Sequence, residues 1–525
     1  MELHSHELWQ LLGLLVVVGA LLVLAPVTRI PYPILLVLGG LALGFAPGIP
    51  KFNLPPELVL IAFLPPLLYS SAFFTSLREL RANVGPIALL AVGLVAVTTA
   101  GVAVIAHWAV SGMTWHAAFV LGAIVSPTDP IAATSIARRL GVPRQIVTLI
   151  EGESLVNDAT ALVLYRAAVV AAVSGTFSLA EAAGRLVMDA AAGIAIGLVV
   201  GYVVRRVRRP LNHSPTEITI SLLTSYLAYL PAEALGVSAV LAAVTAGVYL
   251  GWHTPELTNA ETRLQGVAFW TIFTFVINAA LFTLVGLQLP QVLDGLGAWS
   301  TAELLGAAAA VCAAVIVIRL LWALPFTYFG ATMFETTRRN WKYSAVVGWG
   351  GMRGAVSLAA ALAIPLHTNA GSPFPARELI IFLTFTVILA TLVLQGLSLP
   401  LLIRALRIED DPAERHEESK ARVHAAKAAL ERLDELEGED WVRDDTAERV
   451  RGAYQFRIDR FGERLHGGDG SVEERSRDFQ RLRRELLRAE EDAVVGLRGS
   501  GVISDDVMRR VLRDIALEDV RLDAD

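Results

Sequence analysis

Long, uninterrupted apolar stretches are the feature that most constrains how this chain can fold. A helix of about 20 apolar residues crosses the hydrocarbon core of a bilayer. Lipid admits only helices or closed barrels, because every backbone polar group must find its partner inside the protein. The stretches are continuous rather than alternating, so the sequence predicts an all-α polytopic membrane protein. With 54% of its 525 residues apolar, the chain could not bury its apolar surface in a soluble core.

The sequence predicts thirteen membrane helices. They cover residues 8–26, 31–48, 57–75, 84–110, 115–138, 144–173, 185–204, 216–231, 237–251, 264–289, 302–330, 342–364 and 376–404. The first is too long for the apolar region of a signal peptide, and residues 1–7 contain two glutamates but no lysine or arginine. We therefore expect this segment to remain as a membrane helix with the N-terminus outside.

The basic residues of the predicted loops divide unevenly between the two sides of the membrane. With the N-terminus outside, fourteen of them fall in cytoplasmic loops and three, Lys51, Arg185 and Arg377, fall outside. The fourteen are Arg29, Arg78, Arg81, Arg138, Arg139, Arg144, Arg205, Arg206, Arg208, Arg209, Arg263, Arg338, Arg339 and Lys342. This bias agrees with the positive-inside rule. It predicts a plasma-membrane protein whose C-terminal part lies in the cytoplasm.

Charge divides the chain near residue 407. Residues 1–407 contain 22 Lys and Arg and 18 Asp and Glu, whereas residues 408–525 contain 22 and 32. The first part is the predicted membrane domain, and the second is predicted to form three or four amphipathic cytoplasmic helices. This tail is either a solvated appendage that aids assembly or a regulatory domain, in which His416, His424 or His466 would sense pH.

Two predicted helices are interrupted by sequences that cannot continue an α-helix. In Ser126–Pro130 two prolines remove backbone donors on either side of Asp129. In Gly350–Gly354 three glycines loosen the helix around Arg353. The breaks are seven helices apart, so helices 1 to 6 can map onto helices 8 to 13 as two inverted repeats. Transporters built in this way bind their substrate where the interrupted helices meet.

Helix 6 carries polar side chains at bilayer depth. Asp158 lies near its middle, Ser154 lies one turn earlier on the same face, and Asn157 lies beside them. A carboxylate at this depth costs a few kcal/mol and marks an ion or proton path. A structural network between helices is the other interpretation. It fits Glu153 better than Asp158, because Arg353 offers Glu153 an opposite charge.

The oxygen-bearing side chains favour a hard cation as the substrate. Hydroxyl, amide and carboxylate oxygens come from Thr128, Asp129, Ser154, Asn157 and Asp158. The chain has a single cysteine, which excludes an intrachain disulfide and any multi-cysteine metal site. No pattern of residues predicts a cofactor or a nucleic-acid partner. The partners we expect are ions, lipids and a second copy of the chain.

These motifs resemble those of the monovalent cation:proton antiporters of the sodium/proton exchanger type, including the bacterial NhaP-like antiporters. The resemblance runs over residues 8–404 and is carried by the two breaks and by Gly152–Ala159. It implies that Asp158 binds the cation or the proton, with Asn157 as its neighbour. It also implies that Na⁺ is held by Asp158, Thr128 and Ser154 and that Asp129 lines the site. Glu153 would pair with Arg353.

The resemblance also implies a homodimer. Its dimerisation part would consist of about residues 1–75 and 185–290, and its mobile ion-binding core of about residues 84–173 and 302–404. Many relatives have a carboxylate at the position of Ser70, so an ion-path role for helix 3 is in doubt in this chain.

The implied activity is exchange of a monovalent cation, Na⁺ or alternatively K⁺, for H⁺. Burial disfavours the charged form of a carboxylic acid, so Asp158 would hold either a proton or a cation. Asn157 cannot ionise, which predicts one proton per cation. A cation channel is a weaker alternative, because channels usually build their filters from symmetric subunits. An enzyme is weaker still: Gly152–Val156 begins like a nucleophile elbow but lacks the second glycine.

Overall fold

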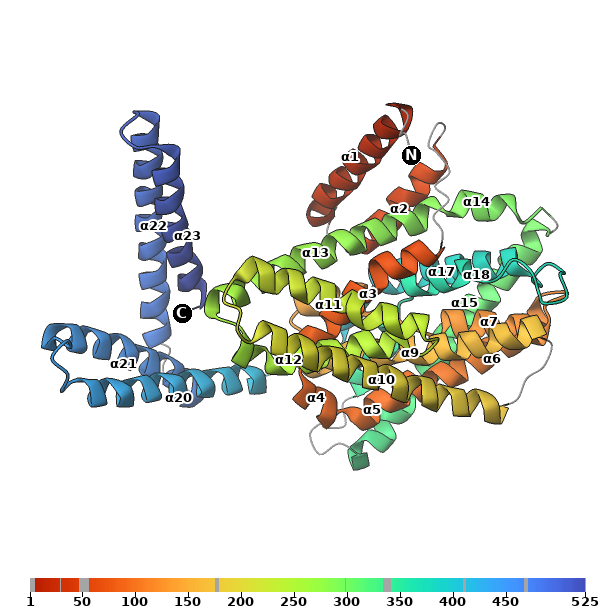
Figure 1. The fold of residues 1–525 in the computed structure, drawn as a ribbon, viewed down its shortest axis with the longest axis horizontal. Helices are drawn as coiled ribbons and strands as arrows, with labels where there is room; N and C mark the ends of the chain where they lie inside the picture. Colours follow the sequence, from red (N-terminus) through yellow and green to blue (C-terminus); the bar gives the residue numbers. More distant parts are fainter. Residues whose placement is uncertain are drawn as a thin grey trace. The chain divides into compact units, whose positions relative to one another are not determined.

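The computed structural model describes residues 5–28, 30–46, 56–174, 179–297, 299–333, 341–408, 412–466 and 471–524. The loop residues Arg29, Lys51, Arg338 and Arg339 lie outside this part of the chain. The described residues form helices and contain no β-strand, which confirms the predicted all-α class (Figure 1). The chain divides into two compact units, Met1–Asp410 and Asp411–Asp525.

All thirteen predicted apolar segments are helical. Nine of them are single helices: α1 (Ser5–Thr28), α2 (Tyr32–Gly44), α3 (Pro56–Phe74), α9 (Arg144–Ser174), α10 (Leu179–Arg208), α11 (Ser214–Ala234), α12 (Ala239–Leu257), α13 (Ala260–Leu287) and α15 (Thr301–Met333). Within the described residues, seven helical segments are long and apolar enough to cross a membrane. The number of thirteen crossings therefore stays a prediction.

The other four predicted segments are runs of shorter helices. They are α5 (Val84–Ala88), η1 (Leu89–Leu94) and α6 (Val95–Ala109); α7 (Trp115–Val125) and α8 (Pro130–Arg139); α16 (Trp341–Trp349) and α17 (Ala355–Leu362); and α18 (Arg377–Ala390), η2 (Thr391–Gln395) and α19 (Gly396–Ala405). Two short helices, α4 (Leu77–Ala82) and α14 (Leu289–Asp294), were not predicted. Each has only six residues, too few for a helical period to show in the sequence.

Several helices of the membrane unit begin at residues whose side chains cap them. The hydroxyl of Thr114 accepts a hydrogen bond from the backbone N–H of Ala117, at 3.3 Å, where α7 begins. The amide oxygen of Asn259 accepts one from Thr262, at 2.7 Å, at the start of α13. Such caps satisfy backbone donors that the first turn of a helix leaves free.

The helices of the membrane unit pack in two groups. In one, α13 lies along α2, and α12 packs against both α10 and α3. In the other, α7 packs against α6 and α9, and α15 packs against α6, α16 and α18. The assignment of these groups to a dimerisation part and an ion-binding core stays a prediction. Movement of one group against the other stays a prediction.

The two predicted breaks are confirmed, and they lie against each other. The first separates α7 from α8, and the second separates α16 from α17. The backbone N–H of Asp129 in the first break donates a hydrogen bond to the carbonyl of Met352 in the second, at 2.8 Å. Residues more than 200 positions apart thus share backbone hydrogen bonding at the centre of the fold.

Glycine is required at the second break because other groups approach its backbone closely. A Cβ atom on Gly354 would lie 1.9 Å from Oδ2 of Asp129. A Cβ atom on Gly351 would lie 2.0 Å from Nε of Arg319. Any larger residue at either position would push a charged side chain away from the crossing.

The second unit forms four helices: α20 (Pro412–Leu436), α21 (Asp444–His466), α22 (Ser471–Gly499) and α23 (Asp505–Ala524). Helix α20 packs against α21, and α22 packs against α23. This confirms the predicted helical tail. His416, His424 and His466 are all exposed, and their regulatory role stays a prediction.

Replacing Gly354 with alanine should destabilise the membrane unit, because the new methyl group has no room beside Asp129. Overpacking of this kind typically costs about 1–3 kcal/mol. Thermal unfolding in detergent should show a lower midpoint for Gly354→Ala than for the parent. Gly306→Ala is the matched control, since nothing lies within 4 Å of its Cβ position in α15. Equal midpoints for the two variants would contradict the close crossing.

Candidate functional site

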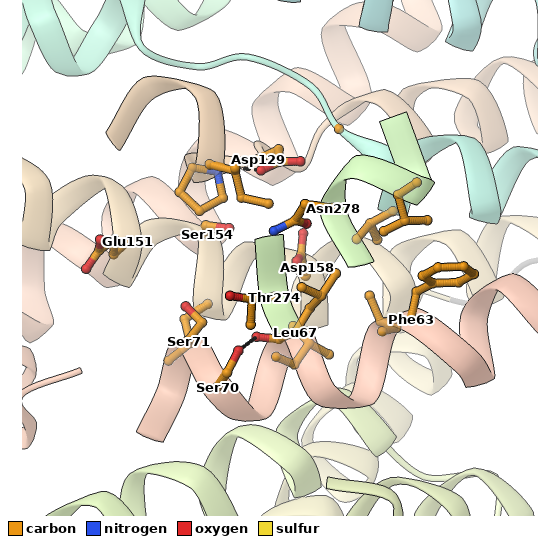
Figure 2. A pocket seen from close by; sticks show the side chains of 18 of the residues that line it. Phe63, Leu67, Ser70, Ser71, Asp129, Glu151, Ser154, Asp158, Thr274 and Asn278 are labelled. Carbon is orange, nitrogen blue, oxygen red and sulfur yellow. Dashed lines mark hydrogen bonds between the residues drawn. The ribbon is translucent and has the colours of Figure 1, made fainter. Parts of the chain in front are cut away.

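A cavity of about 320 Å³ lies beside the crossing of the two breaks, between α3, α9 and α13. Ser154 and Asp158 of α9 and Thr274 and Asn278 of α13 line it (Figure 2). Much of its wall is apolar, with leucine and phenylalanine side chains of α3 and α13. The oxygen-bearing groups therefore stand out in surroundings that strengthen electrostatic interactions.

Asp158 lies near the middle of α9, and its side chain is 7% exposed. It lines the cavity together with Ser154, one turn earlier. In the described part of the chain, no group donates a hydrogen bond to the Asp158 carboxylate, and no basic side chain pairs with it. A carboxylate buried without such compensation is costly. The structure thus leaves an acid that a proton or a cation would stabilise.

Thr128 and Asn157 belong to a network beside Asp158. Asn157 Nδ2 donates to Thr128 Oγ1 at 2.8 Å, and that hydroxyl donates to Glu153 Oε1 at 3.1 Å. Thr128 also lines the cavity, whereas Asn157 does not. Of the five residues predicted to form the site, four reach the cavity: Thr128, Asp129, Ser154 and Asp158. Asn157 instead positions the threonine.

Asp129 caps the helix that follows the first break. Its Oδ1 accepts a hydrogen bond from the backbone N–H of Ile131, at 2.9 Å, as the N-cap of α8. Its Oδ2 is the atom that a Cβ on Gly354, at the start of α17, would meet. A carboxylate is stabilised at a helix N-terminus by the helix dipole. Asp129 therefore offsets the dipole at the start of α8.

The predicted ion pair between Glu153 and Arg353 is wrong. Glu153 pairs with Arg319 on α15, with Nη1–Oε1 at 2.5 Å and Nη2–Oε2 at 2.8 Å. The two side chains are 1% and 2% exposed. Arg319 also donates to the carbonyls of Val347 and Gly348, at 2.9 and 3.1 Å, in the last turn of α16. One guanidinium thus compensates a buried acid and a helix C-terminus together.

Arg353 serves the other interrupted helix. Its Nη1 donates to the carbonyl of Ser126, at 2.6 Å, at the C-terminal end of α7. Its backbone N–H donates to Thr391 Oγ1, at 3.1 Å. The prediction was wrong because the register in which the helices pack cannot be read from the sequence. The sequence shows two arginines within membrane segments, Arg319 and Arg353, but not which of them faces Glu153.

The cavity reaches one end of the helix bundle. Its lining includes Arg138 and Glu151, which form an ion pair at 2.7 Å with the arginine 67% exposed. Arg144, the first residue of α9, forms another ion pair with Glu79 of α4, at 2.8 Å. The deep end holds Asp158 and the crossing of the breaks. The cavity therefore connects the buried acid with the end of the bundle that carries Arg138.

The model of the family described as "Sodium/hydrogen exchanger, transmembrane" matches residues 13–405. The chain belongs to the sodium/hydrogen exchanger family. This is a family of transporters, and its members are integral membrane proteins.

Relatives and one solved structure agree with this assignment. An uncharacterized Na(+)/H(+) exchanger of Mycobacterium tuberculosis is 38% identical over 519 residues, 97% of this chain and 94% of the relative. A sodium, potassium, lithium and rubidium/H(+) antiporter of Bacillus subtilis is 36% identical over 71% of this chain and 58% of its own. The fold is similar to that of the sodium proton antiporter MjNhaP1 of Methanocaldococcus jannaschii. That match has a TM-score of 0.59 and 20% identity, and covers 75% of this chain and 100% of the other.

Sequence reasoning did not identify Asn278, a cavity residue of this exchanger. Asn278 lies on α13, and Figure 2 shows its amide beside Asp158. The signal was present, because an asparagine within an otherwise apolar membrane helix is expensive and usually functional. The sequence did not show that α13 faces α9.

A second buried ion pair of the exchanger lies outside the cavity. Arg208 at the end of α10 contacts Glu217 of α11, with Nη2–Oε2 at 3.4 Å, and both are nearly inaccessible. Thr262 of α13 donates to Glu217 or Ser214, at 3.3 and 2.9 Å. The sequence placed Arg208 in a loop exposed to water. In the structure it ties α10, α11 and α13 together.

Replacing Arg319 with glutamine should strongly destabilise the exchanger, because it leaves Glu153 buried and unpaired. Breaking a buried pair from one side costs about 3–5 kcal/mol. The double variant Glu153→Gln with Arg319→Gln should recover part of that loss in thermal unfolding in detergent. The matched comparison is Glu153→Gln with Arg353→Gln, for which we expect additive losses. Recovery in the second double variant but not in the first would contradict the observed pairing.

Proposed function

We propose that the chain is a secondary antiporter that exchanges Na⁺ for H⁺ across the plasma membrane, one for one. The observation that carries this proposal is the uncompensated carboxylate of Asp158 in a cavity of an exchanger fold. Proton and cation would compete for that carboxylate, and each would cross only when bound to it. The ions are substrates, and the exchange needs no cofactor, no covalent chemistry and no enzyme activity.

The other acids near the crossing of the breaks have structural partners. Glu153 is paired with Arg319, and Asp129 caps α8. Asn157, next to Asp158, cannot ionise. Asp158 is therefore the one acid near the crossing, within the described residues, that is left to exchange its proton. One proton replaced by one monovalent cation moves no net charge across the membrane.

The cation is proposed to contact Asp158 and Ser154, with Thr128 at the edge of the site and Asp129 lining it. Hard oxygen ligands suit Na⁺. The names of the relatives support Na⁺ as the first choice, and that of the Bacillus subtilis relative adds K⁺ as a second candidate. Exchange assays with NaCl, KCl and LiCl in turn decide between them.

We propose that the cavity in this structure opens toward the cytoplasm. It reaches the end of the bundle that carries Arg138, and the uneven distribution of basic loop residues assigns that end to the inside. The N-terminus would then lie outside and the tail inside. The homodimer, with a dimerisation part in residues 1–75 and 185–290, rests on the family resemblance.

Replacing Asp158 with asparagine should abolish cation/proton exchange while the protein stays folded. Asparagine has nearly the same shape as aspartate but neither binds a proton at neutral pH nor carries a charge. Purified protein in liposomes with a trapped pH dye, challenged with NaCl, measures the exchange. Asp459→Asn in the exposed surface of α21 is the control and should exchange like the parent. Exchange by Asp158→Asn at the parent rate would refute the mechanism.

Membrane voltage should not shift the equilibrium of this exchange. A cycle that moves one elementary charge gains about 2.3 kcal/mol of driving force from 100 mV, whereas a one-for-one cycle gains none. We expect the final internal pH of liposomes to depend on the cation and proton gradients alone when valinomycin and K⁺ set the voltage. A shift that grows with voltage would show that a second group, with Asp129 as the nearest candidate, also carries a proton.

A further inference from the structure

Asn278 has a buried oxygen without a hydrogen-bond donor. The side chain is 6% exposed and lies in the C-terminal half of α13, within an otherwise largely apolar stretch. Its Oδ1 is inaccessible and accepts no hydrogen bond from the described residues. Leaving a buried acceptor unsatisfied costs about 1–3 kcal/mol. An orphan group of this kind in a native protein points to a water or an ion as its partner.

The position of Asn278 indicates an ion. Figure 2 shows its amide next to the carboxyl group of Asp158, which comes from α9, and both residues line the cavity. Neither the Asp158 carboxylate nor the amide oxygen of Asn278 accepts a hydrogen bond from the described residues. The nearby hydroxyl groups do not resolve this, because Thr274 donates to the carbonyl of Trp270 at 2.6 Å and Ser70 donates to that of Leu67 at 3.0 Å.

The wall formed by the breaks and α9 offers few free oxygens. The Thr128 hydroxyl is already engaged with Glu153 and Asn157, and Asp129 caps α8. A neutral amide oxygen is a suitable addition to Asp158, because one carboxylate and one monovalent cation already give a neutral site.

We propose that Oδ1 of Asn278 is a ligand of the transported cation, supplied by α13, whereas Asp158 is supplied by α9. This inference rests on the proposed cation/proton exchange. Loss of the ligand lowers the affinity for the cation, whereas the carboxylate of Asp158 still carries the ion at saturating concentration. A substitution at Asn278 should therefore change the affinity for the cation but not the maximal rate of exchange.

The test compares Asn278→Leu with the parent and with Gln288→Leu. Leucine has nearly the size of asparagine and removes both polar atoms. In liposomes, the Na⁺ concentration for half-maximal exchange should rise at least about tenfold in Asn278→Leu, which corresponds to about 1.4 kcal/mol. The thermal stabilisation that NaCl gives to the protein in detergent should shift to higher concentration by the same factor. Gln288 is the matched control, because it is also a buried amide whose oxygen lacks a donor in the described residues, yet it lies outside the cavity. Gln288→Leu should keep the parent affinity.

Each outcome decides the proposal. Parent-like half-saturation in Asn278→Leu overturns it, and so does an equal rise in Gln288→Leu, which would indicate a general packing effect. If Asn278→Leu does not fold, Asn278→Ser replaces it; the shorter side chain should weaken binding, and unchanged affinity overturns the ligand role. A parent protein that neither exchanges nor is stabilised by Na⁺, K⁺ or Li⁺ overturns the proposed function as well. Parent exchange with an unaffected Asn278 variant overturns the ligand role alone.

Discussion

The structure depends on how four helix ends are satisfied inside a membrane. Interrupting α7–α8 and α16–α17 leaves backbone N–H and C=O groups without intrahelical partners, at a depth where water cannot supply them. The two breaks cross and share a backbone hydrogen bond, Asp129 N–H to Met352 O. Arg353 donates to the end of α7 and Arg319 to the end of α16, while Asp129 caps the start of α8. The charges at the crossing follow from these requirements.

This use of charge explains why one acid differs from the others. Glu153 is neutralised by Arg319, and Asp129 is held at a helix N-terminus. Asp158 has neither kind of partner among the described residues, although it is almost as deeply buried. A buried acid without compensation binds whichever positive species reaches it. The charged groups that build the crossing and the acid that we propose exchanges its proton are therefore different residues.

The site lies where the two groups of helices meet, and this also explains which residues the sequence revealed. Thr128, Asp129, Ser154 and Asp158 belong to segments with strong local signals, namely prolines at a break or carboxylates at bilayer depth. Asn278 belongs to the other group, on a helix whose pattern is simply apolar. It lines the cavity that α9 also lines, and no periodicity within one helix shows which other helix it will face.

The sequence by itself determined the helices, the two breaks, the acid at bilayer depth and the change to a charged tail, because each follows from local chemistry: apolar length, prolines, glycines and the cost of burying a charge. The tertiary structure alone decided the partners. Arg319 and Arg353 are both basic residues of membrane helices, yet Arg319 faces Glu153 and Arg353 faces Ser126. That choice depends on the register and rotation with which α15, α16 and α17 pack against α7 and α9. These are set by many contacts between distant segments, such as the close approach at Gly351 and Gly354, and not by any one segment.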